Sequence, residues 1–322
     1  MTDVEGIVGV VGSSQEHRSK FCSALAKRSE SEGLEIYHRK GRITSLLNPS
    51  GYPDKVSTLC RTATLCSSAI VVLPENGKLG WQEAESILSL DAAGIRSGYI
   101  IANPGMVQRQ TLDKILSGTS VSEFRLLELR QEEYSRVDLD SLNVCRAESS
   151  VIVSIDNAFT VKGVGVVGLG FVLAGAVKVH QNLYTPSGKK VEVKSIQVMD
   201  VDLEQAETGQ RVGLAVRGLS ESELEEEGLL VSGDQFTRSL SVDFRKYAYY
   251  PHEITPGLQV NLSLLGQTYS CVVKESGDGH LALETQSPVP NIPFKGALYN
   301  PAIKPGSLRI IGSVSRREFK QS

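Results

Sequence analysis

The pattern of apolar residues changes once along the chain, and this change constrains the fold more than any other feature. Over the first 130 residues, short β-rich runs alternate with segments of helical length, which is typical of a sheet covered by helices. From Ser150 onward, successive β-branched runs are separated by turn signals such as P-S-G at 186–188, with almost no helical periodicity. The sequence therefore predicts an α/β domain followed by all-β structure.

The first part of the chain is expected to hold six strands and four helices. The expected strands are 7–11, 34–37, 43–47, 69–73, 99–102 and 124–129. The expected helices are 19–31, 53–66, 81–93 and 107–116. A turn at Lys40-Gly41 joins two neighbouring strands, which predicts a hairpin and one antiparallel edge strand.

Two boundaries divide the chain into three predicted domains. The polar stretch 131–150 is the expected linker, and a second boundary is expected at 232–234, after the acidic run 221–227, which is expected to be a solvated turn. The predicted domains are 1–147, 148–232 and 233–322.

Composition excludes several classes of function. The 322 residues carry 34 basic and 37 acidic side chains, so a generally basic surface for nucleic acid is excluded, DNA is not an expected partner, and any RNA contact needs a local patch. No apolar run reaches the length of a membrane span, and the start resembles no signal peptide, so we expect a cytoplasmic protein without a membrane partner. The five scattered cysteines lack a C-x-x-C pair, so no metal site is expected.

A loop that could hold phosphate follows the first strand. The segment 12–19 has the spacing of G-x-x-x-x-G-K-[ST], and a strand before it and a helix after it supply the context of a phosphate-binding loop. Gly12 and Ser19 match the ends of the motif, but His17 replaces the second glycine and Arg18 replaces the lysine. An imidazole obstructs the close approach of backbone to phosphate that glycine permits. A degenerate phosphate site and a structural turn both remain open.

Two further segments lie where a guanine-nucleotide site needs them. N-P-S-G-Y at 48–52 follows the third strand in place of D-x-P-G-H, so Asn48 replaces the carboxylate linked to magnesium, and Tyr52 replaces the histidine that positions water, while Gly51 is retained. N-P-G-M at 103–106 follows the fifth strand in place of N-K-x-D, where Asn103 is retained and Met106 cannot accept a hydrogen bond from the base. Each segment alone is weak evidence, but their order along the chain is moderately specific.

A literal G-x-G-x-x-G at 163–168 is rejected as a dinucleotide motif. That fingerprint has to open a helix, whereas residues 169–179 continue as a β-branched run. We expect bends or bulges of a small barrel here instead.

Two segments in the second half carry a family resemblance. I-D-N-A-F-T-V-K-G-V-G at 155–165 and A-E-T-G-Q-R-V-G-L at 206–214 resemble the second domain of translational GTPases, most of all SelB, the elongation factor for selenocysteine. With the degenerate nucleotide motifs, the resemblance covers nearly the whole chain and extends to a SelB-like variant of methanogenic archaea proposed to serve pyrrolysine. It implies an α/β P-loop GTPase-like domain followed by two all-β barrel domains in the elongation factor Tu arrangement.

The resemblance also implies GTP or GDP with Mg²⁺ as cofactors, but the motifs predict that this binding is weak or absent. Each lost charged hydrogen bond costs roughly 1.5–3 kcal/mol, and together with the altered loop the loss is about 5–9 kcal/mol. A nanomolar site would then weaken to micromolar or millimolar affinity or worse. Because the sequence ends at Ser322, we also expect it to lack the C-terminal domain with which SelB reads messenger RNA.

Residues that contact tRNA are implied at two places. Asp156 and Arg211 match positions that line the aminoacyl pocket of SelB, although a salt bridge that braces the barrel is an equal alternative. The run F-R-K-Y-A-Y-Y-P-H at 244–252 interleaves basic and aromatic residues, which favours RNA contact by Arg245, Lys246 and Tyr247. The alternative there is an edge strand with half-buried tyrosines and solvated basic residues.

The sequence thus predicts an elongation factor homologue that binds aminoacyl-tRNA, with the ribosome as a further expected partner and with GTP binding and hydrolysis weak or lost. One alternative is a working GTPase, in which Arg18 holds the phosphates, Ser19 binds magnesium, and Asn48 or Asp54 supplies the missing oxygen. Another is a regulator without enzymatic activity that docks on the ribosome or on a tRNA-modifying enzyme.

Overall fold

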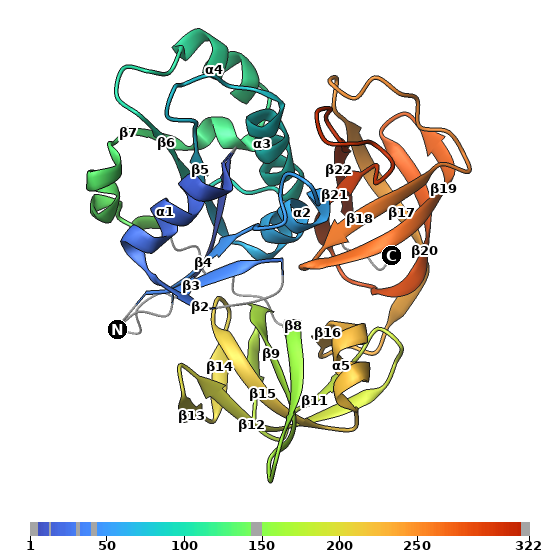
Figure 1. The fold of residues 1–322 in the computed structure, drawn as a ribbon. Coiled ribbons are helices and arrows are strands. Elements are labelled where there is room, and N and C mark those ends of the chain that lie inside the picture. The colour runs from blue at the N-terminus through green and yellow to red at the C-terminus, as the bar shows by residue number, and fades with distance from the viewer. Residues whose placement is uncertain (1–5, 13, 30–32, 40–43, 143–149, 317–322) are drawn as a thin grey trace.

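The computed structural model describes residues 6–12, 14–29, 33–39, 44–142 and 150–316. In these residues the chain forms an α/β unit (6–142, the first unit) and two β-rich units (150–231, the second unit; 236–316, the third unit). Figure 1 shows that each unit borders the other two. The predicted order of one α/β part and a β-rich remainder is confirmed.

The first unit is built on seven strands: β1 (Gly6–Gly12), β2 (Lys27–Ser29), β3 (Glu35–His38), β4 (Thr44–Asn48), β5 (Ser68–Val72), β6 (Gly98–Ala102) and β7 (Arg125–Glu128). Their order in the sheet is β2-β3-β4-β1-β5-β6-β7. All neighbours are parallel except β3 with β4 and β2 with β3, which are antiparallel. The predicted antiparallel edge is confirmed and gains β2, while the turn at Lys40-Gly41 lies outside the described residues.

The helices of the first unit are α1 (Gln15–Leu25), α2 (Val56–Leu65), α3 (Trp81–Ala93) and α4 (Arg109–Leu116). Side chains of β1 alternate between the two faces of the sheet, as a strand buried on both faces requires. Val8 and Val10 pack with α1 on one face, whereas Ile7 and Val11 pack with α2 and α3 on the other. The helix predicted at 19–31 begins earlier, at Gln15, and ends earlier, at Leu25.

The expected linker proves to be partly folded onto the first unit. Three short 3₁₀ segments occur in the first unit, namely η1 (Ser120–Glu123), η2 (Gln131–Arg136) and η3 (Asp140–Leu142). The buried ring of Tyr134 in η2 lies 5.0 Å from that of Phe21 in α1, measured between centroids. Residues up to Leu142 therefore belong to the first unit, because their apolar side chains complete its core; residues 143–149 lie outside the described residues.

The second unit contains β8 (Ile152–Val161), β9 (Gly165–Ala174), β11 (Asn182–Tyr184), β12 (Lys190–Val198), β13 (Val201–Leu203), β15 (Arg211–Arg217) and β16 (Leu229–Val231). The sheet order is β11-β16-β8-β9-β15-β12-β13, and β11 also pairs with β12, so the sheet closes on itself. A separate pair consists of β10 (Ala176–Lys178) and β14 (Gln205–Glu207). The segment 163–168 lies at the β8–β9 turn and in β9, so its rejection as a dinucleotide motif is confirmed.

The acidic run 221–227 is a helix rather than the expected solvated turn. Helix α5 (Glu221–Glu227) has Ser220 as its N-cap, whose side chain accepts a hydrogen bond from the backbone N–H of Glu223. Gly228 ends the helix in the left-handed conformation, at φ 61°. Capping at both ends explains how so short a charged segment becomes helical.

The third unit is a closed barrel of β17 (Phe236–Lys246), β18 (Gln259–Leu264), β19 (Gln267–Gly277), β20 (His280–Pro290), β21 (Phe294–Tyr299) and β22 (Ile310–Arg316), in the order β17-β20-β19-β18-β21-β22. The boundary expected at 232–234 falls between β16 and β17, and the one at 147–148 lies outside the described residues. Within the described ranges, every helix is too short or too polar to cross a membrane.

Candidate functional site

The expected phosphate loop is replaced by the first turns of a helix. α1 begins at Gln15, directly after its N-cap Ser14, so the predicted eight-residue loop at 12–19 is wrong. The backbone N–H of Arg18 donates to the carbonyl of Ser14 (3.0 Å) as an ordinary helical bond. No glycine interrupts the helix at position 17, where His17 stands. His17, Arg18 and Ser19 therefore present side chains, rather than an open row of backbone N–H groups, at this edge of the sheet.

Gly12 is required by the packing of β1 against β5. Its φ is 140°, and a Cβ at this position would lie 2.1 Å from the carbonyl oxygen of Val72. Any side chain would collide with this backbone. The glycine thus has a structural reason that is independent of phosphate binding.

Arg18 points into the first unit and is fully buried, at 0% exposure. Its Nε donates to Oδ1 of Asn48 (2.7 Å), one terminal nitrogen donates to the carbonyl of Gly12 (2.9 Å), and the other donates to the carbonyls of Pro49 (3.0 Å) and Tyr52 (3.4 Å). Burial lowers the pKa of the guanidinium to about 10, so it stays charged at neutral pH. The side chain joins the end of β1 to the segment after β4.

Glu35 is a buried acidic residue in the same part of the first unit and was missed by the sequence analysis. Its Oε2 accepts hydrogen bonds from Ser19 Oγ (2.9 Å), Tyr37 Oη (2.9 Å) and Asn48 Nδ2 (2.8 Å), and its Oε1 lies 3.2 Å from Arg28. Burial alone raises the pKa of Glu35, but these hydrogen bonds and the charge of Arg28 outweigh it and lower the pKa. The one signal in the sequence was an acidic residue inside an apolar β run.

The residues at the expected magnesium position do not fit a magnesium ion. Ser19 Oγ donates to Glu35 and accepts from Asn48 Nδ2 (3.0 Å), while Asn48 Oδ1 accepts from Arg18. Magnesium requires oxygen lone pairs at about 2.1 Å in octahedral geometry, whereas these atoms face N–H groups and a neighbouring guanidinium. The polar groups of this cluster satisfy one another.

Tyr52 is a buried packing residue rather than a group facing water. Its hydroxyl donates to the carbonyl of Gln82 (3.0 Å). The guanidinium groups of Arg18 and Arg309 each lie 5.8 Å from the centroid of its ring. The neighbouring Gly51 donates its N–H to the carbonyl of Gly33 (3.4 Å). The segment after β4 is therefore held by its contacts with Arg18, Arg309 and Gly33.

The residues expected to read guanine lie in a loop after β6. Asn103 Nδ2 donates to the carbonyl of Glu75 (3.3 Å), and Met106 is 52% exposed. His17 shares a 2.6 Å hydrogen bond with the hydroxyl of Tyr134, and its Nε2 lies 4.0 Å from the carboxylate of Glu75. Burial lowers the pKa of His17, so the imidazole is neutral at pH 7. The motif residues are thus divided between separate polar contacts.

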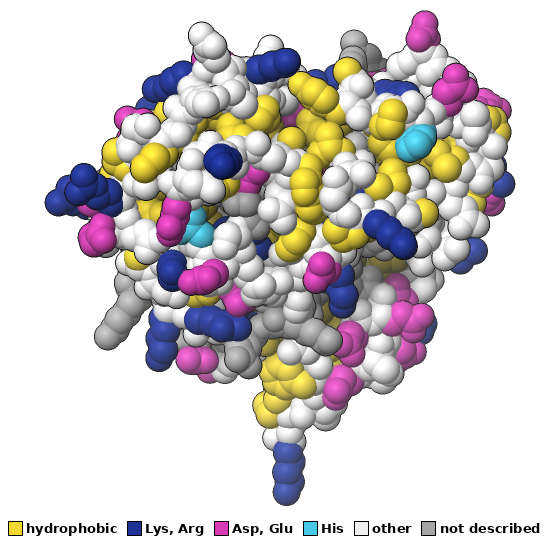
Figure 2. All heavy atoms as spheres, turned by 45° about the horizontal axis from the view of Figure 1, so that its top comes forward, with side chains coloured by type: hydrophobic (Ala, Val, Ile, Leu, Met, Phe, Trp, Pro, Cys, Tyr) yellow, Lys and Arg dark blue, Asp and Glu magenta, His cyan; other side chains and the backbone are white. Residues whose placement is uncertain are grey.

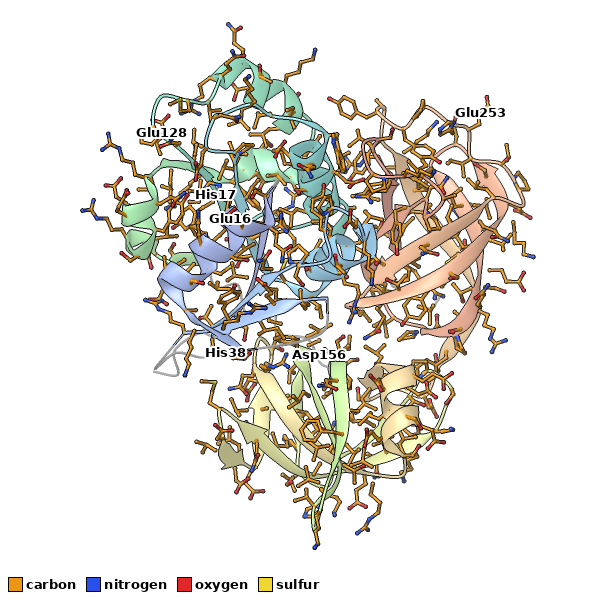
Figure 3. All side chains as sticks on the ribbon, in the orientation of Figure 1. Glu16, His17, His38, Glu128, Asp156 and Glu253 are labelled. Carbon is orange, nitrogen blue, oxygen red and sulfur yellow. The ribbon has the colours of Figure 1, made fainter. Side chains whose placement is uncertain are left out.

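The predicted aminoacyl residues form a nearly buried bidentate pair. The terminal nitrogens of Arg211 donate to both oxygens of Asp156, at 3.1 and 3.0 Å, and the side chains are 12% and 4% exposed. The guanidinium also lies 4.9 Å from the ring centroid of Phe171. Figure 3 shows Asp156 where the second unit meets the first, near the strand that carries His38. The structure brings this predicted pair together.

A cleft of about 720 Å³ lies beside this pair, between α2 and the two β units. Asp156 lines the cleft, together with the charged residues Asp54, Lys55, Arg61, Glu225 and Arg309. Clefts between structural units that combine charged and apolar lining are common ligand sites.

The predicted RNA contacts in the third unit are corrected in part. Tyr247 is buried, and its hydroxyl donates to Oδ2 of Asp91 (2.5 Å) in α3. Arg245 is paired with the same carboxylate and donates to the carbonyl of Gly118 (3.1 Å). These two side chains join the third unit to the first, whereas Lys246 is exposed, with its Nζ 5.9 Å from the ring centroid of Tyr250. On the face shown in Figure 2, basic and acidic side chains are interspersed.

One contact between the units was not foreseen. Arg309 is buried at 2% exposure against Glu85 of α3 at 0%. Its terminal nitrogen donates to Oε2 (2.6 Å), and its backbone N–H donates to Oε1 (2.7 Å). Neither residue lies in a recognisable motif, so the sequence alone offered no signal for this pair.

Comparison with known proteins places these features in context. No protein-family model matches the chain. The uncharacterized protein MJ0325 of Methanocaldococcus jannaschii is 30% identical over 293 residues, which cover 89% of this chain and 92% of that protein. The selenocysteine-specific elongation factor of the same organism is 26% identical over 273 residues, which cover 75% of this chain and 58% of that factor.

A solved structure shares the fold. The crystal structure of translation elongation factor SelB from Methanococcus maripaludis, in complex with the GTP analogue GppNHp, superposes with a TM-score of 0.82 at 19% identity. The match covers 99% of this chain and 80% of that chain. The expected SelB-like, multi-domain fold is therefore confirmed, and by its sequence the chain belongs to the same family as MJ0325.

Proposed function

We propose that this protein is a homologue of SelB and elongation factor Tu that binds the acceptor end of an aminoacyl-tRNA, and that its GTP binding and hydrolysis are weak or lost. The ribosome is a further proposed partner. One contrast carries the proposal. Asp156, which is paired with Arg211, lines an open cleft, whereas the side chains of Arg18, Ser19 and Asn48 at the nucleotide motifs are bonded to one another.

The paired charges suggest how an amino acid is recognised. The Asp156 carboxylate, held in place by the Arg211 guanidinium, offers an acceptor to a polar side chain that enters the cleft. Arg211 is held over Phe171, so the pair is positioned before the ligand arrives. Lys246 remains exposed and is proposed to contact phosphate; Tyr247 is no longer proposed, because it is buried against α3.

Filter binding of charged and uncharged tRNA across a salt series tests the proposal. We expect charged tRNA to bind at least about tenfold more tightly, which corresponds to about 1.4 kcal/mol. Both affinities are expected to fall with salt, because phosphate contacts release counterions. Pyrrolysyl-tRNA belongs in the same series, since it tests the pyrrolysine variant directly.

Two variants test which residue is responsible for the preference for charged over uncharged tRNA. Arg211→Gln is expected to abolish the preference for charged tRNA, whereas Arg217→Gln is expected to preserve it. Arg217 lies on the same strand, β15, but is exposed and paired with Glu192, so it is a matched control. Failure of both charged and uncharged tRNA to bind at low salt would end the proposal.

A further inference from the structure

We infer that the Arg18 side chain is a built-in cation that holds the first and third units together in place of a bound nucleotide and metal. The inference concerns regulation of the proposed site, and it rests on the proposed function only in its consequence for tRNA binding. It begins from the mismatch described above, in which the residues at the metal position leave no oxygen directed at an ion.

The first step is local. Arg18 binds the carbonyls of Gly12, Pro49 and Tyr52 and the side chain of Asn48, so one guanidinium fixes the end of β1 and the whole segment after β4. In a phosphate-binding loop, a bound anion and its metal order the surrounding backbone. Here the ordering charge is covalently attached to α1 and cannot dissociate.

The second step carries the contact to the third unit. The ring of Tyr52 contacts both Arg18 and Arg309, with each guanidinium 5.8 Å from the ring centroid. A terminal nitrogen of Arg309 donates to the carbonyl of Asp54, in the loop that leads into α2 (3.3 Å). The ordered segment after β4 therefore contacts the Arg309 side chain directly, through Tyr52 and the carbonyl of Asp54.

The third step is the closure of the interface. Arg309 is held by Glu85 through its side chain and its backbone N–H, and both side chains are almost completely buried. Separating such a pair leaves a desolvated, unpaired charge, so the two units resist separation. An apolar cluster seals the same seam, with members from both units: Val56, Cys60, Leu88, Ala92, Tyr247, Ala297, Tyr299 and Ile310.

These contacts run from α1 to the start of β22 with no step that requires a ligand. The arrangement in which the cleft is lined by all three units is therefore the resting state of the protein. If the proposed function is correct, tRNA affinity is the same with GTP, with GDP and without nucleotide.

The single tryptophan of the chain makes this inference testable in the full-length protein. Trp81 lies at the seam, with the guanidinium of Arg309 5.6 Å from its ring and the ring of Tyr52 6.4 Å away. For Arg18→Ala we expect a red shift of tryptophan emission, stronger quenching by acrylamide and a larger radius of gyration in small-angle scattering. Millimolar methylguanidinium is expected to reverse these changes, whereas sodium chloride at equal ionic strength is not.

Arg28→Ala is the matched control, because Arg28 is a nearby cation that pairs with Glu35 but is half exposed and lies outside the chain of contacts. It is expected to leave emission and radius unchanged. If Arg18→Ala does not fold, Arg18→Lys replaces it, since one ammonium cannot reach Asn48, Gly12 and Pro49 together. Wild-type quenching and radius in a folded Arg18 variant would overturn the inference, as would a change in either on adding GTP and Mg²⁺ to the wild type. None of these measurements contains tRNA, so loss of tRNA binding alone refutes only the proposed function.

Discussion

At the scale of single residues, the replaced motif positions form a new polar centre. The planar fork of Arg18 can bond in several directions at once, which a lysine cannot do. The amide of Asn48 accepts from Arg18 and donates to Glu35, a double role that an aspartate could not fill. The residues that stand at the altered motif positions are thus the ones whose polar groups satisfy one another in this buried cluster.

Glu35→Gln tests this cluster. We expect it to lower the free energy of unfolding by about 2–3 kcal/mol at pH 7. The amide places an NH₂ group where the carboxylate oxygen accepted hydrogen bonds, so donors that need an acceptor face another donor. Since the folded pKa of Glu35 is lowered, the contribution of the carboxylate is present above its ordinary pKa of 4.5 and is lost as pH falls below that value. Urea denaturation at pH 7 and below pH 4 should show the difference shrinking. Glu128→Gln, at the exposed end of β7, should be close to neutral at both pH values.

At the scale of elements, helix α1 occupies most of the segment where the sequence predicts a phosphate-binding loop. Its N-cap Ser14 accepts from the N–H of His17, and the His17 ring is buried against Tyr134 of η2. The helix and the 3₁₀ segment therefore stabilise each other at the edge of the sheet where a phosphate loop would open. The geometry of this edge depends on contacts between elements that lie far apart in the sequence.

His17→Gly restores a glycine of the phosphate-loop motif but is not expected to restore nucleotide binding. The variant should lose about 1–2 kcal/mol of stability, from lower helix propensity and from the lost hydrogen bond to Tyr134. His17→Ala separates these two effects, because it keeps the helix and removes only the ring contact. Calorimetry with GTP and Mg²⁺ measures nucleotide binding by the glycine variant. Micromolar binding would show that loop geometry, not Arg18, excludes the nucleotide.

At the scale of the whole molecule, buried side chains cross every seam between the units. Phe171 of the second unit belongs to the core of the first, and the cluster around Tyr247 joins the first unit to the third. Phe236 and Leu265 of the third unit pack on a buried cluster of the second. The three units therefore share parts of their cores.

His38 makes the seam between the first and second units sensitive to pH. Burial, and secondly the charge of Arg211, lower its pKa from 6.5 to about 4. Between these values the unfolded chain binds the proton and the folded chain does not, so stability falls as pH drops from about 6.5 towards 4. Allowing for partial solvent exposure, we expect a loss of about 1–2 kcal/mol over this range.

Urea denaturation of wild type and His38→Gln at pH 7 and pH 4.5 measures this contribution. The variant keeps a polar partner for Ser45 but carries no titrating ring, so its loss on acidification should be smaller. His252→Gln, at an exposed position in the third unit, is the control and should lose as much stability on acidification as the wild type. Equal losses in His38→Gln and wild type would contradict the prediction.

Local patterns in the sequence were sufficient for most strands and helices of the first unit, because alternation and amphipathic spacing report burial directly. They missed β2 and helix α5. They revealed the order of the units, and the family resemblance singled out Asp156 and Arg211, which the structure pairs. The early start of α1 and the folded 131–142 segment escaped them, since both depend on contacts such as His17 with Tyr134.

Tertiary structure alone decided what the altered motif residues do. A motif records which side chains stand at a position but not which way they point, and Arg18 turns inward because Asn48 and three carbonyls surround it. In the same way Tyr247 is buried against Asp91, the half-exposed Arg245 pairs with the same carboxylate, and Arg309 pairs with Glu85. Folding brings together these residues, which are far apart in the chain. Pairing of buried charges depends on three-dimensional proximity, so these pairs could not be predicted where no family motif marks both partners.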